Sequence, residues 1–365
     1  MSRRAIVIVL DGCGAGAAPD CAEFGDPPTV STLKNVWNLV GGIEAPNLAQ
    51  TGFLAAAGIG KQTGAAGRLR PLNRGKDSVT GHWEMMGIPV PTPFPTYPSG
   101  FPANLISAFE SAVGRKILGN RPASGTAIVD ELGEEHYRTG RPIVYTSADS
   151  VFQIAAHESI VPIGTLYEWC QIARDLCVPP NNVQRVIARP FNGEPGRFQR
   201  TNNRKDFPVI PPPNLLDRLA DRFGPACGIG VVPELFSGRG FRPGRRTQSN
   251  PEHWLALQQA LDADCQFVFA NFEDTDMLFG HRSDPAGFAN CLEQFDGYLG
   301  ALLARLSADD LLILTADHGN DPTDGSTDHT REYSPLAVVN SQFTQWLGDQ
   351  DGLATVGRLV EGWLE

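Results

Sequence analysis

The chain has 365 residues, of which 41% are hydrophobic and 19% charged, and its formal net charge is −11. This length favours two domains, and the composition is typical of a globular protein. The acidic balance argues against a nucleic-acid partner, because non-specific binding to nucleic acid depends on clustered positive charge. No apolar run reaches the roughly 18 residues of a membrane span, so we expect no membrane partner. An anionic small molecule is not excluded, because a bound metal reverses the local charge.

The cysteines are odd in number and form no Cys-x-x-Cys pair. They are Cys13, Cys21, Cys170, Cys177, Cys227, Cys265 and Cys291. We interpret them as buried free thiols in a reducing compartment, which predicts a cytoplasmic location. The first apolar run, residues 5–10, is too short for the core of a signal peptide.

That first run is also the first predicted strand, and it ends in Asp11 and two nearby glycines. A carboxylate at a strand end, followed by glycines, suits a metal or a phosphate close to the backbone. A helix-capping role explains Asp11 equally well. Helices are predicted next, at residues 32–40 and 45–52.

Residues 75–87 read Gly-Lys-Asp-Ser-Val-Thr-Gly-His-Trp-Glu-Met-Met-Gly and enter a short predicted helix. Thr80 is expected near the N-terminus of this helix, where free N–H groups and the helix dipole favour a phosphate. A threonine hydroxyl is a poor nucleophile unless a base or a metal lowers its pKa. On this segment alone, Thr80 is better explained as a helix cap than as a nucleophile.

Two proline-rich stretches mark the predicted domain boundaries. Six prolines fall between residues 89 and 102, and a second group occupies positions 208 and 211–213. Such segments are stiff and extended, as expected where a chain crosses between domains. Between them, helices are predicted at 105–113 and 164–177 and strands at 143–146 and 184–191. We therefore predict a core domain formed by residues 1–94 and 213–365, with a cap domain inserted at 95–212.

The second part of the core alternates helices with strands. Helices are predicted at 215–223, 253–263, 285–306 and 353–364, and strands at 227–232, 266–271, 311–314 and 336–339. Each strand is a continuous apolar run, which is typical of a parallel sheet covered by helices on both faces. The predicted fold class is α/β, with a parallel-rich central sheet flanked by helices and an inserted α/β cap.

Potential metal ligands follow three of the predicted strands. They are Asp11, Asp274, Asp276, His281, Asp317, His318 and His329. In an open α/β sheet such strand ends lie along one edge, where ligands bind. Carboxylates and imidazoles without thiolates suit Mn²⁺, Zn²⁺ or Fe²⁺ better than Ca²⁺. The set is large enough for two ions, which together can clamp the oxygens of a phosphoryl transfer. One ion can also lower the pKa of Thr80, which changes our interpretation of Thr80 from cap to nucleophile.

Longer motifs span nearly the whole chain in order. They are Leu10-Asp11; Gly75-Lys76-Asp77 with Thr80-Gly81-His82-Trp83-Glu84; Pro93-Phe94-Pro95-Thr96-Tyr97-Pro98; Pro122-Ala123-Ser124-Gly125-Thr126; Tyr145-Thr146-Ser147-Ala148-Asp149-Ser150; Ile187-Ala188-Arg189-Pro190-Phe191; Asp276-Met277-Leu278 with Gly280-His281-Arg282; Ala316-Asp317-His318-Gly319-Asn320; and Thr327-Asp328-His329-Thr330-Arg331-Glu332. Through these motifs the chain resembles the phosphopentomutase family of the alkaline phosphatase superfamily.

The resemblance implies an alkaline-phosphatase-like core with a cap, a phosphorylated Thr80 and two Mn²⁺ ions, with other divalent metals as alternatives. One ion would be held by Asp276, His281 and His329. The other ion would be held by Asp11, Asp317 and His318, with Thr80 beside it. The cap would contact the substrate through Asp149 near the sugar hydroxyls and through Arg185, Ile187 and Arg200 around the sugar and its distal phosphate. Solvated surface charge is the alternative explanation for the two arginines.

One position departs from the family pattern. Where a Gly-Ile-Gly-Lys sequence is usual, this chain has Gly228-Ile229-Gly230-Val231. The positive charge expected to face the substrate is therefore missing at Val231, which bears on substrate identity and leaves the metal ligands complete.

The implied activity is that of an isomerase, a phosphomutase of pentose phosphate and nucleoside metabolism that moves phosphate between the 1- and 5-positions of ribose or deoxyribose. Phospho-Thr80 would phosphorylate the bound sugar phosphate, and the resulting bisphosphate would turn around and return its other phosphate. A sugar bisphosphate would thus act as an activator. The ions, with Lys76 or backbone N–H groups, would stabilise the negative charge on the transferring phosphoryl group.

Val231 favours the alternative of a phosphatase, or of a mutase for a related sugar phosphate. A non-catalytic metal-binding scaffold is a third hypothesis.

Overall fold

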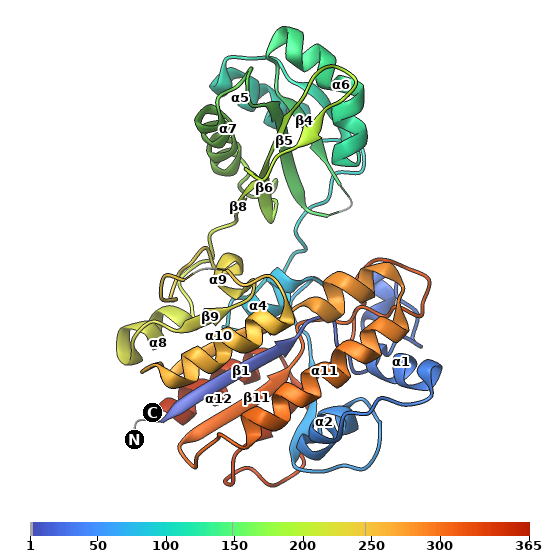
Figure 1. Ribbon diagram of the computed structural model, residues 1–365, viewed down its shortest axis with the longest axis vertical. Coiled ribbons are helices and arrows are strands. Elements are labelled where there is room, and N and C mark those ends of the chain that lie inside the picture. The colour runs from blue at the N-terminus through green and yellow to red at the C-terminus, as the bar shows by residue number, and fades with distance from the viewer. Residues whose placement is uncertain (1–2, 148, 245) are drawn as a thin grey trace. The chain divides into compact units, whose positions relative to one another are not determined.

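The structure, a computed structural model, describes residues 3–147, 149–244 and 246–365. Its chain divides into two compact units (Figure 1). The first unit comprises residues 1–93 and 211–365, and the second comprises residues 94–210. None of the helices in the described part of the chain is both long and apolar enough to cross a bilayer.

The first unit is built on a seven-stranded sheet in the order β13-β2-β12-β11-β1-β10-β9. Its strands are β1 (Arg4–Leu10), β2 (Ala65–Arg70), β9 (Cys227–Ile229), β10 (Phe267–Phe272), β11 (Asp310–Thr315), β12 (Ser334–Val339) and β13 (Gly348–Asp351). The four strands β9, β10, β1 and β11 run parallel, whereas β12 is antiparallel to both of its neighbours. The sheet is therefore mixed and rich in parallel pairs, as predicted.

Helices cover both faces of this sheet because its central strands are apolar on both sides. Alternate residues of β1 point to opposite faces, yet Ile6, Val7 and Ile8 are all fully buried. In Figure 1, α10 and α11 lie in front of β1 and β11, and α12 lies behind them. The helices are α1 (Thr32–Val40), α2 (Pro46–Thr51), α3 (Phe53–Ala56), α4 (Ser78–Met85), α8 (Leu215–Phe223), α9 (Val232–Leu235), α10 (Asn250–Asp262), α11 (Pro285–Leu303) and α12 (Ala354–Leu364).

The second unit has its own mixed sheet, in the order β3-β4-β5-β6-β7, with β8 also paired to β6. Its strands are β3 (Leu118–Pro122), β4 (Ile143–Thr146), β5 (Val151–His157), β6 (Arg185–Asn192), β7 (Gln199–Arg200) and β8 (Lys205–Pro208). Its helices are α5 (Ala103–Val113), α6 (Gly125–Thr139) and α7 (Ile163–Leu176). Apolar side chains from α5, α7 and the sheet form a separate core, so this unit is packed around its own interior.

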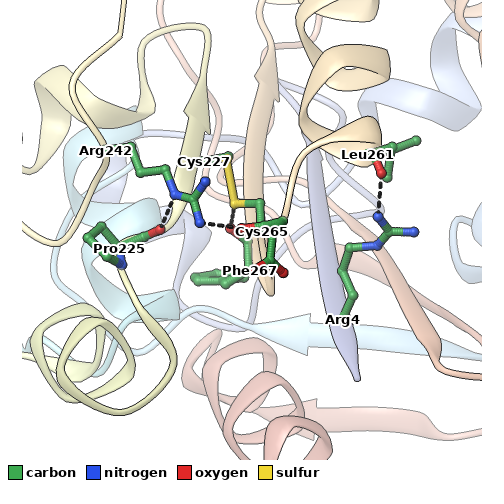
Figure 2. Close-up of a disulfide and its surroundings, with 8 residues drawn as sticks. Arg4, Pro225, Cys227, Arg242, Leu261, Cys265 and Phe267 are labelled. Atoms are coloured by element: carbon green, nitrogen blue, oxygen red, sulfur yellow. Dashed lines mark hydrogen bonds between the residues drawn. A yellow bond between two sulfur atoms is a disulfide. The ribbon is translucent and has the colours of Figure 1, made fainter. Parts of the chain in front are cut away.

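Two sequence-based expectations were wrong. Residues 230–232 do not continue β9, because the chain turns at Gly230, with φ at 73°, and enters α9. The expectation of unpaired cysteines also fails for Cys227 and Cys265, which form a disulfide with their Cα atoms 6.4 Å apart (Figure 2). They meet because Cys227 begins β9 and Cys265 precedes β10, the neighbouring strand. The other five cysteines are free and buried, as predicted.

Candidate metal centre and nucleophile

Three adjacent strands bring the predicted ligands to one edge of the sheet. The central strand β1 lies between β10 and β11 and is parallel to both, so the carboxyl ends of the three strands coincide. Asp11 directly follows β1, and Asp317 lies two residues after β11. Asp276 lies in a π-helical turn, Thr275–Phe279, shortly after β10. This is the edge at which open α/β sheets bind their ligands.

The first group of ligand atoms belongs to Asp11, Asp317 and His318, which lie within 4.8 Å of one another. The Nε2 atom of His318 is 3.4 Å from Oδ1 of Asp11 and 3.3 Å from Oδ2 of Asp317. All three residues are no more than 3% exposed. Donor atoms that share one small divalent cation lie about 3 to 3.4 Å apart, given metal–ligand bonds of roughly 2.1 Å. The three groups therefore have the spacing of a shared cation site.

The second group is centred on Asp276. Its carboxylate oxygens lie 3.2 Å from Nε2 of His281 and 3.5 Å from Nε2 of His329, and the two imidazole nitrogens are 3.1 Å apart. His318 also approaches this group, because its ring packs against that of His329 with centroids 4.0 Å apart and the ring planes tilted by 33°. His318 thus belongs to two sets of mutually close ligand atoms, one with Asp11 and Asp317 and the other with Asp276 and His329.

Backbone carbonyls orient two of these imidazoles. Nδ1 of His281 donates to the carbonyl of Thr327 at 2.7 Å, and Nδ1 of His318 donates to the carbonyl of Gly319 at 3.1 Å. These contacts select the tautomer in which Nε2 is unprotonated and faces the carboxylates, which is the arrangement of metal-binding histidines.

The electrostatics around Asp11 fit a bound cation. Burial, with the nearby charges of Asp317 and Asp276, raises the pKa of Asp11 well above its usual value. Burial also lowers the pKa of His318, which keeps the imidazole in its neutral, ligating form. Within the described part of the chain, Oδ1 of Asp11 and Oδ2 of Asp317 are buried without a hydrogen-bond partner. Buried carboxylates are normally paired or coordinate a metal, so these orphaned oxygens fit a divalent cation.

Amide side chains that sequence reasoning missed hold the carboxylates in place. Nδ2 of Asn271 donates to Oδ2 of Asp11 at 2.6 Å, and Nδ2 of Asn320 donates to Oδ1 of Asp276 at 2.7 Å. The second oxygen of each carboxylate faces a histidine: Oδ1 of Asp11 lies near His318, and Oδ2 of Asp276 lies near His281. The one available signal was position, since Asn271 lies within β10 and Asn320 within the Asp317-His318 motif. Asp274, also a candidate in the sequence, instead accepts from the backbone N–H of Asn250 at the start of α10.

Thr80 lies in the first turn of α4, and its hydroxyl faces Asp77. Asp77 is the N-cap: its Oδ1 accepts the backbone N–H of Thr80 at 3.1 Å. The Thr80 hydroxyl donates toward Oδ2 of Asp77 at 2.9 Å, and Thr80 is only 1% exposed. The helix passes close to the metal ligands, because a Cβ on Gly81 would lie 2.4 Å from the carbonyl oxygen of Asp317. Glycine at position 81 is thus what allows the Thr80 turn to pack against the Asp317 loop.

Comparisons with known proteins agree with this geometry. Residues 244–360 match the Metalloenzyme superfamily. The chain is 47% identical to the phosphopentomutase of Carboxydothermus hydrogenoformans, over 98% of this chain and 95% of that protein. It is 45% identical to the phosphopentomutase of Dictyoglomus turgidum, over 100% of this chain and 94% of that protein. The chain belongs to the phosphopentomutase family.

The fold expected for that family is confirmed. The PH0037 protein of Pyrococcus horikoshii superposes with a TM-score of 0.52 at 15% identity, covering 100% of this chain and 97% of that one. Together with the mixed, parallel-rich sheet and the superfamily match, this assigns the alkaline-phosphatase-like α/β fold. The ligand groups and the superfamily match also support binding of a divalent metal.

Two further residues that the sequence brought to attention, Lys76 and Val231, lie in the first unit. Lys76 is engaged by carboxylates, with its Nζ 2.9 Å from Asp26 and 3.1 Å from Asp328. Val231 is half-buried and immediately precedes α9, and its carbonyl accepts the backbone N–H of Glu234 at 2.9 Å.

The predicted substrate contacts lie in the second unit. Asp149 is exposed in the loop between β4 and β5. On β6, Arg185 lies 3.5 Å from Asp206, whereas the side chain of Ile187 is 2% exposed. Arg200, on β7, lies beside the first residue of α6, where a Cβ on Gly125 would be 2.2 Å from Nη2 of Arg200.

Proposed function

We propose that this chain interconverts the 1- and 5-phosphates of ribose or deoxyribose, through phosphorylated Thr80 and a sugar bisphosphate. Its relatives carry the name phosphopentomutase over nearly the full length of both chains, so it is a phosphomutase, an isomerase. The observation that carries the proposal is the pair of adjacent ligand groups at one sheet edge, directly against the helix that bears Thr80.

The proposed cofactors are two Mn²⁺ ions. Asp11, Asp317 and His318 would hold one ion. Asp276, His281 and His329 would hold the other. When bound, the ions supply positive charge for the attacking and leaving oxygens of the phosphoryl group. Their oxygen and imidazole ligands suit Mn²⁺, although Zn²⁺ and Fe²⁺ share the preference.

The protein's own part of the reaction starts at Thr80. Phospho-Thr80 gives its phosphoryl group to the free hydroxyl of the bound monophosphate. A bond forms from phosphorus to the sugar oxygen, which loses its proton, while the bond from phosphorus to Oγ1 of Thr80 breaks and Oγ1 takes up one proton, so that no proton is gained or lost overall. The reverse step takes the other phosphate from the bisphosphate. A free sugar bisphosphate would therefore load an unphosphorylated enzyme. The dipole at the start of α4 would favour the negative charge of a phosphoryl group on Thr80.

The unit at residues 94–210 is proposed as the inserted cap that contacts the substrate. Arg200 lies at the N-terminus of α6, where the helix dipole adds to its charge, and this supports a role with the distal phosphate. Arg185, Ile187 and Asp149 would contact the sugar. A cap that excludes water also protects the phosphoenzyme from hydrolysis. The proposed location is the cytoplasm, on the ground of the five free, buried cysteines, although the Cys227–Cys265 disulfide is unusual for a reducing compartment. Fractionation of cells that produce the protein tests it.

The decisive experiment follows phosphate by ³¹P nuclear magnetic resonance after phosphorylated enzyme is mixed with ribose 5-phosphate. We expect ribose 1-phosphate, and no product from a Thr80→Ala variant. Release of inorganic phosphate without ribose 1-phosphate would overturn the mutase proposal. That outcome would support the second candidate, a phosphatase or a mutase for a related sugar phosphate, which the uncharged Val231 favours.

A further inference from the structure

A second hydroxyl in the first turn of α4, that of Ser78, lies close to the metal ligands. Ser78 is the first residue of α4 and is half-buried, and its Oγ lies 3.2 Å from Nε2 of His318. The Thr80 hydroxyl, two residues later, is buried and directed to Asp77. The two hydroxyls of this turn therefore face different partners.

The separation of Ser78 from His318 matches those of the other ligand atoms. Around Nε2 of His318, Oδ2 of Asp317 lies at 3.3 Å and Oδ1 of Asp11 at 3.4 Å. Oγ of Ser78, at 3.2 Å, falls in the same narrow range. Because His318 donates from Nδ1 to Gly319, its Nε2 is the acceptor nitrogen that would ligate a cation. Oγ of Ser78 is thus within hydrogen-bond distance of this nitrogen, and neighbouring corners of a coordination polyhedron show a similar separation.

We propose that Ser78 is a further oxygen ligand of the cation held by Asp11, Asp317 and His318. This inference rests on the proposed metal site and adds a residue that the sequence did not indicate. The two carboxylates already balance a divalent charge, so the remaining ligands are best neutral, as the imidazole and a serine hydroxyl are. A hydroxyl is also a hard oxygen donor of the kind that Mn²⁺ accepts.

Backbone contacts hold Ser78 in this position. Nδ1 of His82 lies 2.9 Å from the carbonyl oxygen of Ser78 and 3.4 Å from Oδ2 of Asp317. His82 is fully buried, so its ring joins the Ser78 turn to the Asp317 carboxylate. The Asp77 cap fixes the same turn from the other side. Ser78 is thus anchored to the metal-binding loop before any cation arrives.

The first test measures Mn²⁺ binding by isothermal titration calorimetry, using the dephosphorylated, metal-free full-length chain. We expect Ser78→Ala to weaken one of two sites about tenfold or more, and Ser78→Thr, which keeps a hydroxyl, to stay within about threefold of the wild type. Ser111→Ala is a matched control, because Ser111 lies on α5 in the second unit and its hydroxyl donates to the carbonyl of Ser107 in the same helix. Wild-type affinity at both sites in Ser78→Ala would overturn the proposal.

The second test keeps the proposal falsifiable if the alanine variant is unstable. A Ser78→Cys variant should bind Cd²⁺ through its thiolate and show a cadmium–thiolate absorption band beyond that of the wild type, whose own free cysteines provide the baseline. Ser111→Cys should add no such band. Full Cd²⁺ occupancy of Ser78→Cys without the additional band would contradict a direct ligand role. If instead the wild type bound no divalent metal, the proposed metal site itself would fail.

Discussion

Replacing Asn320 with alanine removes one hydrogen bond at the candidate metal centre and leaves the backbone contacts intact. The Asn320 amide donates to Oδ1 of Asp276 at 2.7 Å, and Asn320 is fully buried. Its backbone N–H, which bonds to the carbonyl of Gly12 at 2.9 Å, is unchanged by the substitution. The variant therefore isolates the orientation of one metal-binding carboxylate.

The size of the effect follows from the charge of the acceptor. A hydrogen bond to an ionised group contributes about 1.5 to 3 kcal/mol. Since roughly 1.4 kcal/mol corresponds to a tenfold change in binding, we expect Mn²⁺ affinity at the Asp276 site to fall about 10- to 100-fold. Activity should return in large part when Mn²⁺ is raised in proportion, because the ligand set itself is complete.

Calorimetric titration of Mn²⁺ into Asn320→Ala, alongside the exposed-site control Asn203→Ala, checks this expectation. Asn203 contacts Glu158 in the second unit, so its loss should leave metal binding unchanged. Affinity in Asn320→Ala within about twofold of the wild type would refute the idea that this amide positions Asp276.

Three further predictions concern pH, packing and metal removal. Burial raises the pKa of Glu332 from 4.5 to about 7. The carboxyl of Glu332 therefore stays protonated to a higher pH in the folded state than in the unfolded chain. Its contribution to the free energy of unfolding is complete below pH 4.5 and is lost as pH rises through about 7. Chemical denaturation from pH 5 to 8 should show that the free energy of unfolding declines in the wild type and changes less in Glu332→Gln. Equal dependence on pH in the two proteins would argue against a role of Glu332. Arg331 is buried and donates to Asp20 and to the carbonyls of Pro71, Asn73 and Gly75. Arg331→Ala should therefore lower the free energy of unfolding by about 3 to 5 kcal/mol in urea titrations. A loss below about 1 kcal/mol would contradict a stabilising role of the hydrogen bonds that Arg331 donates. A chelator should abolish mutase activity and lower the thermal midpoint, both restored by Mn²⁺, whereas unchanged activity in metal-depleted enzyme would exclude the metal requirement.

The charged metal ligands could be predicted from the sequence, because they follow apolar runs that are recognisable as strands. Asp11, Asp276 and Asp317 follow recognisable strands, and strand ends of an α/β sheet share one edge. The spatial order β11-β1-β10 could not be read from the chain, because an apolar run does not reveal its neighbours. The disulfide was missed for the same reason: it depends on β9 lying beside β10.

The supporting residues were harder to predict. Asn271 and Asn320 are buried amides, and an amide has no spacing pattern that marks it as the partner of a metal-binding carboxylate. Strands β2 and β13 were missed because Ala65–Arg70 and Gly348–Asp351 contain glycine and charged residues in place of an apolar run. Ser78 was overlooked beside Thr80 because only the folded helix shows which hydroxyl faces His318.

The central claim is that Thr80 carries the transferred phosphate. Fragment mass spectrometry of the purified enzyme, after incubation with Mn²⁺ and a pentose bisphosphate, tests it most directly, because the peptide containing residues 75–87 holds both Ser78 and Thr80. We predict a single phosphate, located on Thr80 and removed by excess ribose 5-phosphate. Phosphate on Ser78 or elsewhere, or a peptide that stays unphosphorylated, would contradict the account.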